Sequence, residues 1–283
     1  MCRSGLSCCR AALDDEAARA RLRCAMTHRF LACVAAHIAL ALLCGCRSAP
    51  RHAGPSDPNP RMSTDVVTFQ PRSITLNAVE HKYALYVPTF LAKAQPAPMI
   101  VFLNGRGECG TDGVKQTTQG LGNAIRADPG AWPFVCVFPQ KPDFDSTWLD
   151  HEALVLGVIE KTRGEQNIDP DRIYLTGLSQ GGRGTWAIGT RHPDLFAALA
   201  PICGFGPDEQ LGTSLKGLPI WAFHGEADRV VPAAESQRLA KAASERGADV
   251  KLTLYLGVDH NSWDKAYREE SLSTWLLEHR RRP

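Results

Sequence analysis

The chain has 283 residues, a net charge of +2, 44% hydrophobic residues and 22% charged residues. These values are ordinary for a globular protein, and the length suits one large α/β domain with a short appendage better than two full domains. The small net charge gives no sign of nucleic-acid binding. No histidine or cysteine spacing in the sequence is typical of a zinc site, so we expect no metal and no other cofactor.

A targeting segment is predicted near the N-terminus. Residues 30–43 form an apolar run that is too short to span a bilayer, which needs about 20 residues, but is typical of a signal peptide. The letters LCGC that end at Cys46 resemble a bacterial lipobox, so we expect lipidation of Cys46, which anchors the protein to a membrane outside the cytoplasm. A plain signal, which would leave the protein secreted or periplasmic, is the alternative. Met26 directly precedes this segment, and we expect translation to start there.

The remaining N-terminal residues predict a tether. Residues 1–46 are assigned to the signal region, and residues 47–64, rich in proline and polar residues, to a flexible linker. The folded domain is expected over residues 65–283. Seven of the ten cysteines precede residue 47. Among the others, Cys136 is expected to be buried, and a disulfide between Cys109 and Cys203 is left open.

Apolar, β-branched runs alternate with helix-compatible stretches along the domain. The expected strands are 73–76, 82–87, 99–103, 134–138, 173–176, 197–202, 220–224 and 251–256. The expected helices are 149–163, 182–192, 233–246 and 264–280. This order predicts an α/β fold with a mainly parallel central sheet, helices on both faces, and an antiparallel hairpin of the first two strands at one edge.

A sharp turn after the strand 173–176 carries a candidate nucleophile. Ser179 lies in the pattern Gly-Leu-Ser-Gln-Gly, the G-x-S-x-G nucleophile elbow, between a strand and a helix. The pattern alone also suits an ordinary glycine-rich turn. A serine hydroxyl needs a base within hydrogen-bond reach, so the downstream residues decide between these interpretations.

Two loops downstream supply an acid and a base in the required order. Asp228 follows the strand 220–224, and His260 follows the strand 251–256, which gives the chain order Ser, Asp, His. Histidine can accept and return a proton near pH 7, and an aspartate can hold it in one tautomer. Glu226 and Asp259 are rival acids, and His260 as an ordinary loop histidine is the alternative.

Other residues are expected around this serine. The backbone N–H groups of Gln180 and Arg106 are the predicted oxyanion hole, because Arg106 lies in the glycine-rich loop after the strand 99–103. Substrate contacts are assigned to Trp148, Glu108 and Trp263, with core packing as the alternative for each tryptophan. No long insertion separates the strands 197–202 and 220–224, so we expect an open site.

Four motifs resemble those of a known family. They are LNGRGECG, the segment DRIYLTGLSQGGRGTWAIGTRHPDLFAALAPICG, PIWAFHGEADRVVP and HNSWDKAY, and the likeness covers roughly residues 70–281. Together they resemble the predicted esterase/peptidase group of the α/β-hydrolase superfamily, which is related to phospholipase/carboxylesterases and dienelactone hydrolases.

The resemblance implies an α/β-hydrolase fold and hydrolysis of carboxylic esters through an acyl-enzyme. The aromatic and polar residues expected around the pocket suggest an aromatic or sugar-linked ester, and the open site suggests a small or polymer-linked one. A serine peptidase of the same fold and a non-catalytic binding lipoprotein are the alternatives. Asn104 stands where these relatives usually have histidine, and Gln180 where they often have methionine. The oxyanion donors are main-chain groups, so the Asn104 departure concerns the efficiency of the reaction more than its mechanism. The oligomeric state is not predicted.

Overall fold

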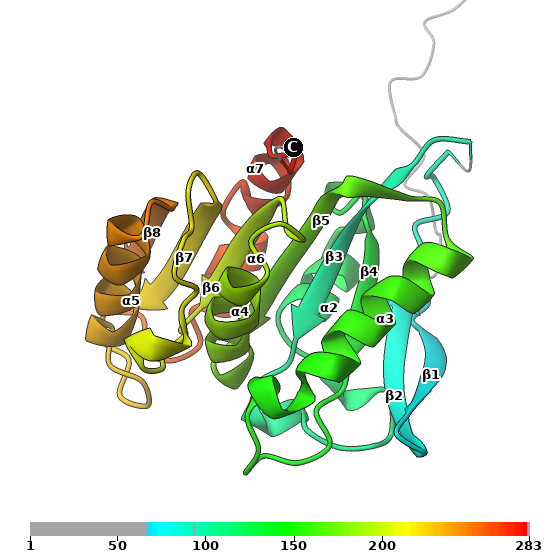
Figure 1. The fold of residues 1–283 in the computed structure, drawn as a ribbon, viewed down its shortest axis with the longest axis horizontal. Helices are drawn as coiled ribbons and strands as arrows, with labels where there is room; N and C mark the ends of the chain where they lie inside the picture. The colour runs from blue at the N-terminus through cyan, green and yellow to red at the C-terminus, as the bar shows by residue number, and fades with distance from the viewer. Residues whose placement is uncertain (1–66, 93, 282–283) are drawn as a thin grey trace, which may run out of the picture. The chain divides into compact units, whose positions relative to one another are not determined.

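An eight-stranded sheet runs through the computed structural model, which describes residues 67–92 and 94–281 (Figure 1). The spatial strand order is β1-β2-β4-β3-β5-β6-β7-β8. The pairs β1–β2 and β2–β4 are antiparallel, and every pair from β4 across to β8 is parallel. The strands are β1 (Gln70–Leu76), β2 (Val79–Tyr86), β3 (Ala97–Leu103), β4 (Val135–Pro139), β5 (Ile168–Leu178), β6 (Ala198–Ile202), β7 (Pro219–Gly225) and β8 (Asp249–Tyr255).

Helices cover both faces of this sheet. They are α2 (Leu121–Ala127), α3 (Glu152–Glu165), α4 (Gln180–Arg191), α5 (Ala234–Glu245), α6 (Trp263–Arg268) and α7 (Leu272–Glu278). Short 3₁₀ turns are η1 (Arg106–Glu108), η2 (Lys115–Thr117), η3 (Pro129–Ala131), η4 (Trp148–His151) and η5 (Asp208–Gln210). Buried residues of α3, α4 and α5 share one core cluster, and those of α2, α6 and α7 share the other.

Alternation along β3 shows how one strand serves both cores. Met99, Val101 and Leu103 belong to the cluster under α3, α4 and α5, whereas Ile100 and Phe102 belong to the cluster on the opposite face. Successive side chains of a strand point to opposite faces, so a strand covered on both sides is apolar throughout. All five of these residues are fully buried, as an interior strand of a parallel sheet requires.

The predicted α/β architecture is confirmed, including the antiparallel edge hairpin, while several boundaries differ. β5 begins five residues before the predicted start at 173, and α2 was not predicted. The single helix expected over residues 264–280 is wrong, because the chain forms α6 and α7 instead. The N–H groups of Glu269 and Glu270 both donate to the carbonyl of Lys265, which closes α6 before Ser271 begins the next helix.

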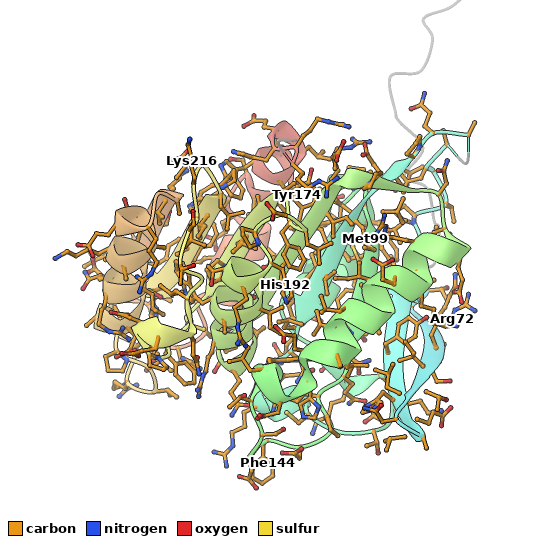
Figure 2. The ribbon with its side chains drawn as sticks, viewed as in Figure 1. Arg72, Met99, Phe144, Tyr174, His192 and Lys216 are labelled. Carbon is orange, nitrogen blue, oxygen red and sulfur yellow. The ribbon has the colours of Figure 1, made fainter. Side chains whose placement is uncertain are left out.

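Loops after the parallel strands gather at the edge of the sheet where the strands have their carboxyl ends. Phe144, on the loop after β4, projects at this edge, while Tyr174 and Lys216 lie toward the opposite edge (Figure 2). In open α/β sheets the functional site lies where the strands end at their carboxyl termini. This edge therefore contains the residues that the sequence singled out.

Some expectations fall outside what the structure describes. The signal region, Met26, Cys46 and the tether 47–64 all lie outside the described residues. No helix among residues 67–92 and 94–281 is long and apolar enough to cross a bilayer. Within the same ranges, no group of three or more His, Cys, Asp or Glu side chains is placed to hold a metal ion.

The central core should be sensitive to loss of an aromatic ring. Phe102 is fully buried, and its ring lies 5.4 Å from that of Phe138 and 6.1 Å from that of Tyr267. We expect Phe102→Ala to lower the free energy of unfolding by about 3–5 kcal/mol, because the cavity adds to the lost burial. Urea unfolding measures this loss. Phe90→Ala, at a side chain that is 52% exposed, is the control and should change stability by less than about 0.5 kcal/mol.

Candidate active site

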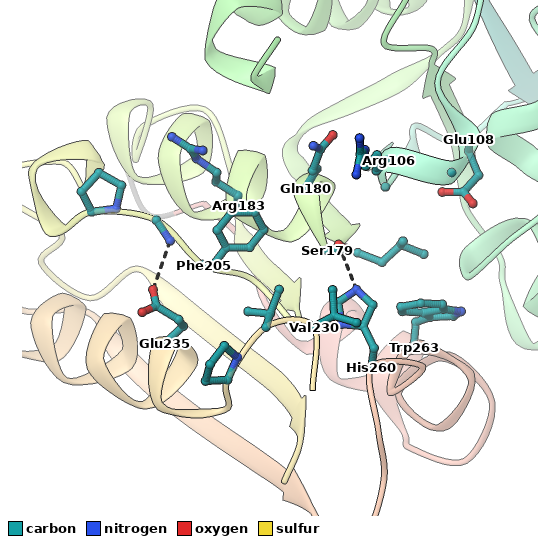
Figure 3. Close-up of a pocket in the computed structure, with 17 residues that line it drawn as sticks. Arg106, Glu108, Ser179, Gln180, Arg183, Phe205, Val230, Glu235, His260 and Trp263 are labelled. Carbon is teal, nitrogen blue, oxygen red and sulfur yellow. Dashed lines mark hydrogen bonds between the residues drawn. The ribbon is translucent and has the colours of Figure 1, made fainter. Parts of the chain in front are cut away.

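A strained turn positions Ser179 between β5 and α4. Its backbone has φ 55° and ψ −115°, a conformation that costs a non-glycine residue about 1–3 kcal/mol. The Ser179 N–H donates to the Ile202 carbonyl at 2.9 Å, and its own carbonyl accepts from the Arg183 N–H at 2.9 Å. The surrounding backbone thus maintains the turn, and the hydroxyl faces the pocket (Figure 3).

Two glycines allow the turn to sit against the neighbouring strand. A Cβ on Gly181 would lie 1.9 Å from the carbonyl oxygen of Leu103, and a Cβ on Gly177 would lie 2.6 Å from that of Gly181. Both contacts are with backbone, so a flexible side chain cannot give way. The G-x-S-x-G spacing therefore follows from close packing of the elbow on the end of β3.

The structure brings the three predicted catalytic residues together. The Nε2 atom of His260 is 3.1 Å from the Ser179 Oγ, and its Nδ1 atom is 2.7 Å from Oδ2 of Asp228 (Figure 3 shows the first contact). Asp228 lies on the loop after β7 and His260 on the loop after β8. A neutral imidazole with its proton on Nδ1 can donate to the carboxylate and accept from the serine hydroxyl.

Asp228 is set up to remain ionised. Burial alone would raise the pKa of this carboxyl, but hydrogen bonds from His260 and from the N–H groups of Val231 and Val230 together lower it below its usual range. Both N–H groups donate to Oδ1 at 2.8 Å. The carboxylate is thus a permanent negative charge beside His260 at neutral pH.

Neither rival acid occupies this position. Asp259 binds the N–H and guanidinium of Arg229, and its Oδ1 also accepts the N–H of His260 at 2.8 Å. The hydrogen bonds from the backbone and side chain of Arg229 and from the His260 backbone lower the pKa of Asp259 to about 2. Glu226 is exposed at the start of the loop. Asp259 therefore shapes the loop of His260 without touching its ring nitrogens.

Asn104 supports the loop that carries the predicted oxyanion donor. Its fully buried amide donates to the Gly105 carbonyl at 2.7 Å and accepts from the Lys141 N–H at 3.2 Å. The asparagine thus connects the loop after β3 to the loop after β4. Arg106 and Gln180 both line the pocket, and their N–H groups remain the predicted oxyanion hole.

Trp148 has a different place from the one expected. It is 1% exposed, it does not line the pocket, and its indole N–H donates to the Asn104 carbonyl at 3.0 Å. Its assignment as a substrate contact is therefore wrong, because the ring is buried behind the loop. Trp148 supports the loop from the core side, as the packing alternative for this tryptophan predicts.

An open pocket of about 790 Å³ lies above Ser179 (Figure 3). Glu108 and Trp263 line it, as predicted, and Trp263 packs edge-on against the His260 ring at 5.4 Å. Burial raises the pKa of the Glu108 carboxyl. The sequence interpretation missed Arg183 and Val230, which also line the pocket and carry no motif that would reveal them.

The cysteines near the site are free. The possible disulfide between Cys109 and Cys203 is not present. Cys203 is fully buried directly after β6, where burial raises the pKa of its thiol to about 12. Cys109 lies by the Asn104 amide, with 3.6 Å between Sγ and Nδ2. The two cysteines therefore belong to different parts of the site.

One buried residue beside the triad was not given a chemical role from the sequence. The Nε2 atom of His224, the last residue but one of β7, lies 3.1 Å from Oδ2 of Asp228. The sequence signal is its spacing, because it stands four residues before the predicted acid in FHGEAD.

The indole hydrogen bond of Trp148 should contribute measurably to stability. We expect Trp148→Phe to lower the free energy of unfolding by about 1 kcal/mol more than Trp186→Phe does, because only the first change removes a hydrogen bond, the one to the Asn104 carbonyl. The pair is matched: both rings are 1% exposed, and the Trp186 Nε1 has no hydrogen-bond partner among the described residues. Urea unfolding of both variants measures the difference, and equal losses would contradict the role given to Trp148.

Comparisons with known proteins agree with this fold. Residues 150–271, which include all three triad positions, match the model of the Dienelactone hydrolase family. A thermostable esterase of known crystal structure is 34% identical with a TM-score of 0.62, over 75% of this chain and 63% of that chain.

Curated relatives match over shorter stretches. NocK of Nocardia uniformis subsp. tsuyamanensis is 24% identical over 172 residues, or 58% of this chain and 50% of that protein. The bifunctional acetylxylan esterase/xylanase XynS20E of Neocallimastix patriciarum is 32% identical over 105 residues, or 35% of this chain and 15% of that protein. The chain thus spans half or less of the length of these two relatives. With the sheet order and the elbow described above, these similarities show that the chain has the α/β-hydrolase fold and that its residues 150–271 are similar to the Dienelactone hydrolase family.

Proposed function

We propose that the protein is a serine hydrolase that cleaves carboxylic esters through an acyl-enzyme. One observation carries the proposal: an unbroken hydrogen-bonded chain runs from the Ser179 hydroxyl through His260 to the buried Asp228, and Ser179 and His260 line an open pocket. The esterases among its relatives support the reaction class. This geometry is the one that turns a serine hydroxyl into a nucleophile.

Each group has a defined task in the proposed reaction. The Ser179 Oγ attacks the ester carbonyl carbon while its proton passes to Nε2 of His260, and Asp228 stabilises the imidazolium that forms. The N–H groups of Gln180 and Arg106 stabilise the oxyanion. The intermediate collapses, and the alcohol leaves with the proton held by His260. Water then attacks the acyl carbon and gives a proton to His260. His260 returns the proton to the Ser179 Oγ as the acyl bond breaks, and the acid is released.

The pocket supports an aromatic or carbohydrate-linked ester as substrate. Phe205 and Trp263 supply aromatic walls. The guanidinium of Arg183 lies 5.6 Å from the centre of the Phe205 ring. The guanidinium of Arg106 lies 4.6 Å from the centre of the Phe144 ring. Rings beside polar groups suit sugars and aromatic acids. The acetylxylan esterase relative also favours an ester on a carbohydrate.

The proposed location is extracytoplasmic, with an N-terminal lipid anchor on Cys46. The sequence pattern before Cys46 supports it. In a bacterial host we expect the native chain to incorporate a palmitate analogue and to sediment with membranes, and Cys46→Ala to do neither. A native chain that is unlabelled and released into the medium would instead support the plain signal.

Ser179 should carry all ester turnover. We expect Ser179→Ala to lower kcat for p-nitrophenyl acetate by about 10⁴-fold or more, because the nucleophile is lost. Ser244→Ala, at an exposed serine on α5, is the control and should leave the rate unchanged. A fluorophosphonate probe should label the native chain once and the Ser179 variant not at all. Absence of labelling in folded native protein would favour a binding lipoprotein.

A substrate panel separates ester from peptide hydrolysis. Acetyl, feruloyl and glucuronoyl esters are compared with an aminoacyl anilide, using Ser179→Ala as the blank for each. We expect measurable kcat/KM for at least one ester and a much lower value for the anilide, because an amine needs more protonation to leave than an alcohol. Faster turnover of the anilide would overturn the esterase proposal in favour of a peptidase.

A further inference from the structure

The carboxylate of Asp228 is shared between two histidines. Its Oδ2 atom lies 2.7 Å from Nδ1 of His260 and 3.1 Å from Nε2 of His224. The side chains of Asp228 and His224 are both fully buried. The Ser-His-Asp arrangement thus has a fourth member, which contacts the acid.

Hydrogen bonding sets the tautomer of His224. Its Nε2 faces two acceptors, Oδ2 of Asp228 and the carbonyl of Val231 at 2.9 Å, so this nitrogen carries the proton. Its Nδ1 lies 2.7 Å from the hydroxyl of Ser236, on α5. Burial lowers the pKa of His224, so the ring is neutral. Its Nδ1 accepts the hydrogen bond of the Ser236 hydroxyl, whose other acceptor, the Gly204 carbonyl, is farther away at 3.3 Å.

We propose that His224 is a positioning residue for catalysis, which holds Asp228 against His260 by donating a neutral hydrogen bond to their shared carboxylate oxygen. Since both Oδ1 bonds come from backbone N–H groups, His224 is the one side chain besides His260 that donates to this carboxylate among the described residues. A lysine or arginine here would add a positive charge close to the imidazolium that forms on His260. A neutral donor orients the acid without that repulsion.

Other titratable or charged groups lie around the cluster. They are the buried Cys203 thiol, the exposed Asp259–Arg229 ion pair, and Glu235, which pairs with Arg238. None of these side chains forms a hydrogen bond to His224 in the described part of the structure. A change in the pH dependence of Ser179 labelling on altering His224 would therefore report on the shared carboxylate.

Loss of the donor should change the pH dependence in a defined direction. Without the His224 bond, Oδ2 is less stabilised as an anion and attracts the His260 proton more strongly, which favours the imidazolium. We expect His224→Phe to slow fluorophosphonate labelling of Ser179 at neutral pH by roughly tenfold, because the acid is less well held. The labelling rate falls as the pH is lowered, and we call this part of the pH profile its acid limb. We expect the midpoint of the acid limb to move up by about half a pH unit.

Three further variants make the test specific. His224→Gln retains an amide donor and an acceptor for Ser236, so we expect labelling within about threefold of the native rate and no shift of the acid limb. His192→Phe, at a histidine that is 3.0 Å from Glu152 outside the site, controls for a general loss of stability and should leave the limb in place. If His224→Phe does not fold, Ser236→Ala, which releases the ring, should produce a smaller upward shift.

The outcomes distinguish this inference from the function on which it rests. A folded His224→Phe protein with the native rate and acid limb, or a Gln variant as slow as the Phe variant, would overturn the inference. If His224→Phe is unfolded, an unshifted acid limb of the labelling rate in Ser236→Ala would also overturn the inference. Labelling requires no correct ester, so a native chain that is labelled but turns over no ester would defeat the proposed function alone.

Discussion

The position of Ser179 depends on how closely the elbow approaches the end of β3. The carbonyl of Leu103 lies where a Cβ on Gly181 would have to be, so the turn is seated on backbone and cannot relax away from it. That contact places the start of α4 beside the loop that follows β3, the loop that carries Arg106. One steric constraint therefore brings the nucleophile and both predicted oxyanion donors to the same edge of the sheet.

The rest of that edge is held by hydrogen bonds between loops. In the loop after β4, the Lys141 N–H donates to Asn104, and the Lys141 carbonyl accepts from the Gly110 N–H at 2.9 Å. The Gln140 side chain donates to the Glu108 carbonyl. The Lys141 side chain is fully buried, and its ammonium donates to the carbonyls of Asp143 and Ser146. A buried charge needs such partners, so this lysine orders the loop that it lies beneath.

Sequence patterns were sufficient to predict the strands of the sheet and the order of the candidate catalytic residues. The strand periodicity, the glycine spacing around Ser179 and the chain order of Asp228 and His260 predicted the sheet and the three residues that the structure brings together. They could not predict which side of a loop a large side chain would occupy. Trp148 and Trp263 both follow polar stretches, but one packs behind Asn104 and the other lines the pocket. That choice is made by tertiary packing, as is the break between α6 and α7.

Asn104 illustrates why a departure from a motif need not disable the site. The usual histidine at this position could support the loop through its ring, and here the same support comes from two sources. The asparagine amide binds the Gly105 carbonyl and the Lys141 N–H, and the Trp148 indole binds the Asn104 carbonyl from below. Every one of these bonds is buried, so water cannot easily replace it. The loop is therefore held by buried hydrogen bonds to its own carbonyl groups and through the Asn104 side chain, and none of these bonds involves a side chain that lines the pocket.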